Sequence, residues 1–191
     1  MDPSSQLSTA SYSRRSEAPS LPLATAQRED VPAPPRRVLV ATDASATSAG
    51  AERAGVEIAA QVGASLVFVS VIDPSRLRLP GGLFHTRVDQ VRSQREVALA
   101  GIVARARELG VAAQFLIWEG EPGSSVIDAA EAEGADLIVV GSHNRGPIGR
   151  RVLGSVSSYV VRHARGQVVV VRPGQNLADV WPGSPESGAT T

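Results

Sequence analysis

Short apolar runs alternate with helical apolar spacing through the middle of the chain. Five runs consist almost entirely of apolar residues: 38–41, 66–72, 113–118, 137–140 and 168–171. Runs of this length and composition are typical of strands that are buried on both faces of a sheet. The segments between them repeat apolar residues every three or four positions, which predicts helices. We expect these helices at 47–62, 84–109, 123–133 and 155–163.

Glycine and proline mark where these elements end. Gly63, Gly110 and Gly134 each follow the last apolar position of a predicted helix, a usual place for glycine. Residues 73–83 contain two prolines and two glycines, so we expect a loop there. The apolar side of the long helix is expected to comprise Val88, Val91, Leu99, Ile102, Val103 and Leu109.

The order of the elements predicts the fold class. Strands that alternate with helices pair in parallel through right-handed crossovers. We therefore predict an α/β fold with an open five-stranded parallel sheet, helices on both faces and a single domain. That domain is expected over residues 36–173, between a disordered N-terminal arm, 1–35, and a flexible C-terminal tail, 174–191. Both flanking segments are rich in small and polar residues and lack periodicity.

Composition narrows the chemistry available to the chain. Its 191 residues include no cysteine, and the formal net charge at pH 7 is +0. All 19 basic residues are arginine, which excludes a Schiff-base lysine and the lysine of a Walker-type phosphate loop. The neutral balance gives no global attraction to nucleic acid or to an anionic membrane. With no signal peptide and no apolar span, we expect a cytoplasmic protein.

Two segments that follow predicted strands could form a ligand site. Ligands of open α/β sheets bind beyond the carboxyl ends of the strands. Residues 41–45 follow the first strand. The segment 141–157, a glycine-rich loop over 141–154 and the start of a helix, follows the fourth. Arg145, Arg150 and Arg151 and the start of a helix would favour phosphate in that loop. The alternative is an ordinary exposed loop in which Ser155 caps the helix.

Several segments resemble the universal stress protein family. These are Val38–Asp43, Val69–Asp73 and Gly134–His143, and the resemblance extends over 36–173. The family's nucleotide signature is Gly, two residues, Gly, nine residues, Gly, then Ser or Thr. Gly141, Gly154 and Ser155 match it, while Asn144 stands at the second glycine. The resemblance implies a Rossmann-like fold of the adenine nucleotide alpha hydrolase-like type.

The resemblance also implies a ligand and the residues that bind it. The expected cofactor is ATP, with Mg²⁺ as a candidate companion ion. The residues carried over as its site are Ala41, Thr42, Asp43, Val71, Gly141, Ser142, His143, Asn144, Arg145, Gly146, Gly154, Ser155, Val156 and Ser157. Asp43 would face the ribose or the adenine, or, as the alternative, serve in a turn or helix cap.

Three functions stay open at this point. The first is a homodimeric stress-response regulator that binds an adenine nucleotide and hydrolyses ATP slowly at most, without catalytic residues that we can name. The second, motivated by Asn144, is a dimeric scaffold of the same fold without nucleotide. The third is a hydrolase or transferase, for which no nucleophile and base can be named. Glu119 and Glu121 are interpreted as solvent-exposed, negatively charged residues that lead into the next helix. The three histidines are not expected to form a metal site.

Two further expectations concern assembly and affinity. The run Val168–Val171 ends the domain and is expected to be an edge strand, whose unpaired backbone favours a homodimer. A tail folded over that edge is the alternative. Arg145→Ala is expected to weaken ATP binding by about tenfold or more, because charge-assisted contacts are strong. Arg36 and Arg37 lie at the opposite end of the first strand and should matter less.

Overall fold

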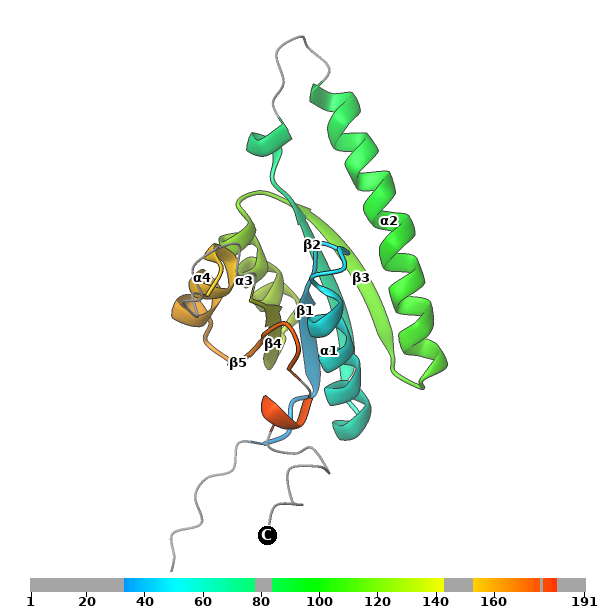
Figure 1. Cartoon of the computed structure of the whole chain (residues 1–191), viewed down its shortest axis with the longest axis vertical. Coiled ribbons are helices and arrows are strands. Elements are labelled where there is room, and N and C mark those ends of the chain that lie inside the picture. Colours follow the sequence, from blue (N-terminus) through cyan, green and yellow to red (C-terminus); the bar gives the residue numbers. More distant parts are fainter. Residues whose placement is uncertain (1–32, 78–83, 143–152, 176, 182–191) are drawn as a thin grey trace, which may run out of the picture. The chain divides into compact units, whose positions relative to one another are not determined.

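The structure, a computed structural model, describes residues 33–77, 84–142, 153–175 and 177–181. These residues belong to one unit, Ala33–Thr191. Its strands and α-helices (Figure 1) are β1 Arg37–Ala41, α1 Ala49–Val62, β2 Ser65–Ile72, α2 Phe84–Glu108, β3 Ala113–Glu119, α3 Pro122–Glu133, β4 Leu137–Gly141, α4 Ser155–His163 and β5 Gln167–Val171. Two short 3₁₀ helices, η1 Pro74–Leu77 and η2 Leu177–Asp179, complete the described elements.

The five strands form one parallel sheet in the order β3-β2-β1-β4-β5. Val38 of β1 lies between Leu66 of β2 and Leu137 of β4, so the first strand is central. The chain therefore winds outward from β1 to β3 and then returns to β4 beside β1. This order reverses between β1 and β4, where ligands bind in such sheets. The α/β class, the parallel sheet and the single domain predicted from the sequence are confirmed.

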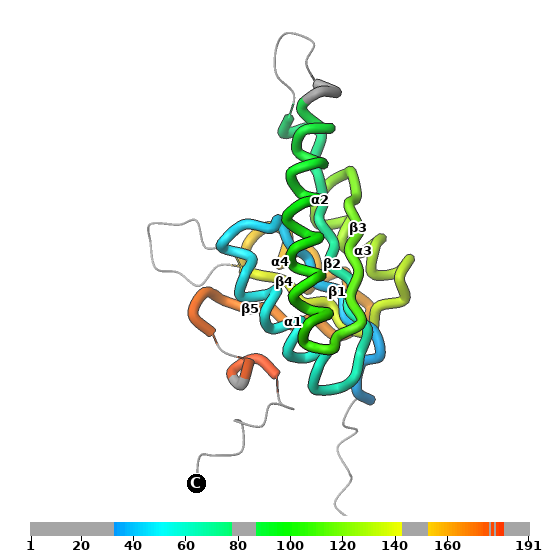
Figure 2. Tube along the Cα trace, turned by 90° about the vertical axis from the view of Figure 1, so that its right-hand side faces the viewer, coloured from blue at the N-terminus to red at the C-terminus, as the bar shows by residue number. Residues whose placement is uncertain are grey.

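Helices cover both faces of the sheet. Alternate residues of a strand point to opposite faces: Val38 and Val40 join a core with α1 and α2, whereas Leu39 joins a core with α3 and α4. Figures 1 and 2 show that α2 lies over β2 and β3, on the face of the sheet that it shares with α1. Because both faces are buried, the strands need no polar alternation, which explains their continuous apolar runs.

The structure departs from the sequence prediction in local details. The segment predicted as a loop, 73–83, begins with the helical turn η1. The first long helix starts at Ala49, with Ser48 in the N-cap position. Leu109 was expected on the apolar side of α2 but is 69% exposed. It follows the last residue of the helix, where the chain turns toward Gly110, so helical spacing no longer sets its direction.

The segment after β5 contributes to the core. Leu177 of η2 is buried, and Val180 and Trp181 pack against the core on the α1 side. The Trp181 indole nitrogen is buried and has no hydrogen-bond partner among the described residues. No helix in the described ranges is both long and apolar enough to cross a membrane.

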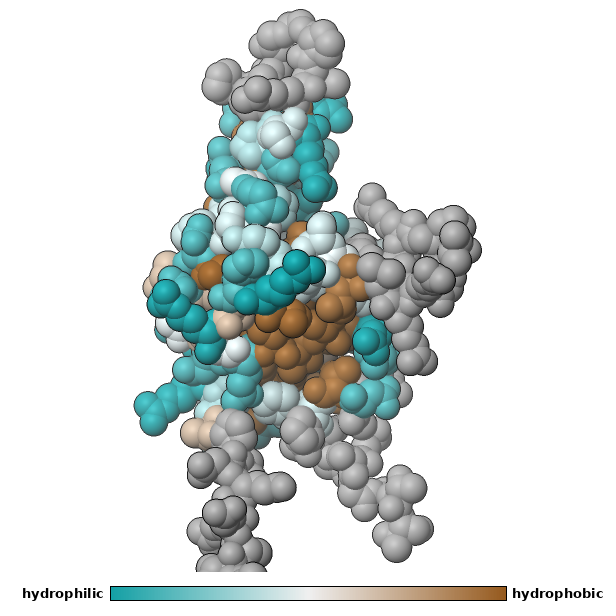
Figure 3. Space-filling model, turned by 90° about the vertical axis from the view of Figure 1, so that its left-hand side faces the viewer, coloured by the Kyte–Doolittle hydropathy of each residue, from teal (hydrophilic) through white to brown (hydrophobic). Residues whose placement is uncertain are grey.

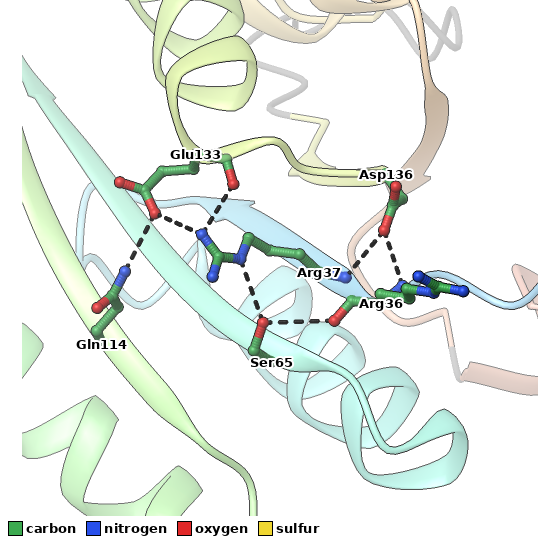
Figure 4. Close-up of polar contacts among 6 residues, drawn as sticks. All are labelled: Arg36, Arg37, Ser65, Gln114, Glu133 and Asp136. Carbon is green, nitrogen blue, oxygen red and sulfur yellow. Dashed lines mark hydrogen bonds and ion pairs between the residues drawn. The ribbon is translucent and has the colours of Figure 1, made fainter.

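A polar cluster joins strands at the amino ends of the sheet (Figure 4). The Asp136 carboxylate accepts hydrogen bonds from the backbone N–H groups of Arg36 (2.8 Å) and Arg37 (3.1 Å). The Arg37 guanidinium donates to the carbonyl and to the carboxylate of Glu133, at 2.8 and 3.1 Å. Arg36 and Arg37 thus lie at the end of β1 remote from residue 43, as the sequence predicts.

Candidate functional site

A cleft of about 540 Å³ opens at the carboxyl ends of the strands. Volumes of this size are usual for sites that hold small molecules. The predicted site residues that line it are Ala41, Thr42, Asp43, Val71, Gly141, Gly154, Ser155, Val156 and Ser157. Ser142 is buried beside the cleft, and its N–H donates to the Val171 carbonyl at 2.8 Å. Residues 143–152, which include His143, Asn144, Arg145 and Gly146, lie outside the described residues.

Asp43 presents one carboxylate oxygen to the turn that follows β1. Its Oδ1 accepts hydrogen bonds from the N–H and hydroxyl of Ser45, at 3.1 and 2.5 Å, and from the Ser48 hydroxyl at 2.5 Å. Within the described residues no hydrogen bond reaches Oδ2 from protein. The turn role proposed as an alternative for Asp43 therefore occupies one oxygen and leaves the other available to a ligand.

The pKa of Asp43 is lower than its ordinary value of 3.8. Burial acts in the opposite direction and would raise the pKa, but the hydroxyls of Ser45 and Ser48 stabilise the carboxylate. The Ser45 N–H and the positive charge of Arg95 lower the pKa further. Asp43 is therefore an anion at neutral pH, and it can accept a hydrogen bond from a ligand.

The turn itself is tightly fixed by its own side chains. Thr42 is buried, donates its hydroxyl to Glu52 of α1 at 2.6 Å and accepts from the Ala44 N–H at 2.8 Å. Ala44 has φ 54°, a left-handed backbone conformation that residues other than glycine rarely adopt. These contacts hold Asp43 in one place relative to the sheet.

The start of α4 forms the opposite wall. Gly154 is the N-cap in an extended conformation and makes no side-chain cap bond, so Ser155 is the first helical residue rather than the cap. The N–H groups of Ser155, Val156 and Ser157 have no acceptor within the helix, as in every α-helix, and together with the helix dipole they favour an anion. The Ser157 hydroxyl is buried and donates to the Gly154 carbonyl at 3.1 Å.

Apolar side chains line much of the remaining cleft. They come from β2, β4, α3 and α4: Val69, Val71, Val126, Val140 and Val156. Only Val71 and Val156 were predicted from the sequence. The other three sit on core faces of strands and helices, where a ligand-facing valine has the same pattern as a core valine. An apolar slot beside an anion site suits a flat aromatic base joined to phosphate.

The sequence analysis missed the wall formed by η1 and α2. Asp73, Arg76, Leu77, Val91 and Arg95 line the cleft from this side. Arg76 pairs with Asp73 at 3.0 Å, and the hydroxyl and N–H of Ser75 also bond to this carboxylate. The sequence analysis assigned none of the five to a ligand site, although it placed Val91 on the apolar side of its helix. Only the packing of α2 on β2 brings position 95 beside the strand ends.

Other candidates from the sequence lie elsewhere. Glu121 caps α3 by accepting from the Ser124 N–H at 2.8 Å, and Glu119 pairs with Arg92. His163 stacks on Tyr159, at a ring separation of 4.0 Å, where α4 ends. In the described part of the chain no three histidine or acidic side chains gather as a metal-binding group.

A family model provides the decisive comparison. The model of the universal stress protein family matches residues 34–172. The chain belongs to the universal stress protein family. A curated family member, universal stress protein MJ0531 of Methanocaldococcus jannaschii, is 30% identical over 72% of this chain and 82% of its own length.

Solved structures of universal stress proteins agree with this assignment. A family protein from Burkholderia pseudomallei has 33% identity and a TM-score of 0.61, covering 71% of this chain and 95% of its own. A universal stress protein in complex with cAMP has 26% identity and a TM-score of 0.55, covering 72% and 97%. The Archaeoglobus fulgidus protein in complex with dAMP has 25% identity and a TM-score of 0.53, covering 70% and 95%.

Proposed function

We propose that this universal stress protein binds an adenine nucleotide in the cleft and acts as a homodimeric stress-response regulator. The observation that carries the proposal is the combination of three features in one cleft. An apolar slot runs past Val71, and the Asp43 Oδ2, which no described residue bonds, lies at the end of β1. The N–H groups that start α4 begin at Ser155. A nucleotide offers a base, a ribose and phosphate to these three features.

The ligands named for related structures support an adenine nucleotide. One relative is described in complex with cAMP and another in complex with dAMP. Both ligands combine adenine with a single phosphate. The signature residues Gly154 and Ser155 lie at the start of α4, where a phosphate would be stabilised. We expect ATP, with Mg²⁺ as its companion ion, as the main ligand of this chain.

A regulatory role suits the chain better than rapid catalysis. The protein has no lysine and no cysteine, which removes two common nucleophiles and the phosphate-loop cation. Asp43 Oδ1 already accepts three hydrogen bonds, and the pKa of Asp43 is lowered. Asp43 is therefore a weak general base at neutral pH. We expect ATP hydrolysis, if it occurs, to be slow.

The homodimer is proposed to form through β5. Among the described strands, β5 is at one edge of the sheet and pairs on one side only, with β4. Val168 and Val170 are half-buried, and Val161 of α4 is 46% exposed. Figure 3 shows an apolar area on the side of the molecule where Figure 1 places β5 and α4. Pairing of two edge strands would cover it and satisfy the backbone.

Calorimetric titration of the purified protein tests the nucleotide. ATP with Mg²⁺, AMP and cAMP are each titrated, and thermal shift is measured alongside. We expect saturable binding of at least one of them with a rise in melting temperature. No heat and no thermal shift at millimolar ligand would overturn the proposal.

The scaffold alternative rests on Asn144 and has its own test. If the wild-type protein fails to bind while Asn144→Gly binds, the second glycine of the signature is required and the chain is a nucleotide-free member of the family. If both proteins bind with similar affinity, asparagine supplies the turn that glycine otherwise would. A mass spectrum of ligand released from freshly purified protein identifies the nucleotide in that case.

A further inference from the structure

Arg95 brings a positive charge to the cleft from the middle of α2. Its side chain is half-buried, and one guanidinium nitrogen donates to the Ser70 hydroxyl at 2.5 Å. Ser70 is completely buried within β2, immediately before the cleft-lining Val71. The strand thus anchors the arginine at the cleft wall.

Most of the hydrogen-bonding capacity of Arg95 is unused by the described residues. A guanidinium group has five N–H donors, and the bond to Ser70 uses one of them. No carboxylate of the described residues lies within ion-pair distance of Arg95, whereas Arg92, one turn earlier on α2, pairs with Glu119. A partly buried cation with free donors, lining a cleft, is suited to contact a ligand.

The strand order separates the anchor of Arg95 from the strand that leads to the anion site. Ser70 belongs to β2, while the start of α4 follows β4, and β1 lies between these two strands. Two strand spacings amount to about 10 Å. With the phosphate at Ser155, the base of a nucleotide would extend toward Val71 and the end of β2. Asp43, which follows the central β1, faces the cleft between the two ends.

We infer that Arg95 is a specificity-determining residue that donates a hydrogen bond to a ring nitrogen of adenine, while Asp43 Oδ2 accepts one from the 6-amino group. This inference rests on the proposed function. Each polar edge of adenine carries the amino donor next to a ring-nitrogen acceptor, N1 on one edge and N7 on the other. The Asp43 carboxylate, which follows β1, and the Arg95 guanidinium, which α2 holds against β2, offer the complementary acceptor and donor.

The first test replaces the donors of Arg95 and keeps its apolar stem. Arg95→Met is expected to weaken the binding of AMP and of adenosine by the same factor, about tenfold or more, because both ligands carry the base. The double variant Ser70→Ala/Arg95→Met avoids leaving the buried Ser70 hydroxyl without a partner and should show the same loss. Arg92→Met is the matched control on the same helix and should bind like wild type, since Arg92 does not line the cleft.

The second test removes the acceptor from the ligand. In 1-deaza-AMP and 7-deaza-AMP, one ring nitrogen of adenine is replaced by CH. One of these analogues should bind wild type about as weakly as AMP binds Arg95→Met. The same analogue and AMP should bind Arg95→Met equally well, because the contact is already lost.

The outcomes separate this inference from the proposed function. If wild type binds none of these ligands, the proposed function fails. If wild type binds AMP, but Arg95→Met weakens the binding of AMP and leaves the binding of adenosine unchanged, Arg95 contacts phosphate and the inference is wrong. It is also wrong if Arg95→Met binds both ligands like wild type, or if neither deaza analogue is weaker than AMP on wild type.

Discussion

Single side chains at the ends of β1 and β2 decide the electrostatics of the cleft. Asp43 carries a negative charge that Ser45 and Ser48 stabilise, and Arg95 carries a positive charge that Ser70 anchors. The negative charge of Asp73 is balanced by its ion pair with Arg76. The cleft is therefore polar at defined atoms rather than uniformly charged, which favours recognition of a base edge over simple attraction of an anion.

Asp43 makes the stability of the protein depend on acid pH. Its lowered pKa stabilises the fold fully above the ordinary value of 3.8, and this contribution is lost as the pH falls through the folded-state pKa. We expect Asp43→Asn to lower the free energy of unfolding by about 1 kcal/mol at pH 7, because bonds to a neutral acceptor are weaker. The difference from wild type should shrink from about pH 4 downward.

Urea unfolding of both proteins between pH 7 and pH 2.5 measures this difference. Asp73 and Glu121 also have lowered pKa values, but they are present in both proteins and cancel in the comparison. A difference that stays constant over the whole pH range would show that Asp43 is not the titrating group.

Helices and strands meet at close contacts that only small residues permit. On α1, a Cβ atom added to Gly55 would lie 2.2 Å from Cγ2 of Val40 on β1. That distance is too short for two carbon atoms that are not bonded, so the Val40 side chain, the helix or the strand would have to shift. The approach of α1 to the sheet therefore depends on glycine at this position, and α1 in turn carries Glu52, which holds Thr42.

Gly55→Ala is expected to lower the free energy of unfolding by about 1–3 kcal/mol, the usual range for overpacking a core. Gly101→Ala on α2 is the matched control, because its added Cβ would meet only the Arg105 guanidinium at 3.7 Å. Alanine there should stabilise the protein by about 0.5–1 kcal/mol, the gain of alanine over glycine within a helix. Urea denaturation compares the two variants, and a neutral Gly55→Ala would contradict the close contact.

At the scale of the whole molecule, β5 is an edge strand of the described sheet, and this bears on assembly. Two neighbouring valines of this strand differ in their suitability for a test of the interface. Val169 is buried in the core on the α1 side, so its replacement would disturb the fold itself. Val170 is half-buried on the other face and belongs to the same edge strand. Replacement of Val170 therefore separates assembly from folding better than replacement of Val169.

Val170→Lys is expected to convert the proposed homodimer into a monomer, because a charged side chain on an edge strand opposes pairing. Val97→Lys on α2 is the control, since Val97 is 77% exposed and lies on a different element. Light scattering at micromolar concentration measures the mass of each protein. A wild-type protein that is monomeric under these conditions would refute the dimer, and a dimeric Val170→Lys would refute the proposed interface.

Much of the cleft was predictable because its backbone signals are local. Asp43 follows an apolar strand and Gly154 precedes a helix, so the sequence alone could assign one to a strand end and the other to a helix start. Val140 and Val126 could not be assigned to the cleft, because their sequence pattern is that of the core. Arg95 could not be assigned either, because it lies 25 residues after Ser70 in the chain and reaches the cleft only through packing.

The sequence by itself determined the strands, the α-helices, their parallel pairing and two of the segments that line the cleft. These features depend on hydrophobic periodicity and on glycine, which act over a few residues. Only the tertiary structure decided which side chains share the cleft: it placed Arg95 beside Ser70 and left Asp43 Oδ2 without a hydrogen bond from any described residue. It also buried Leu177, from a segment expected to be a flexible tail, against the core. Such contacts depend on the distance between elements, which the spacing of residues along the chain does not encode.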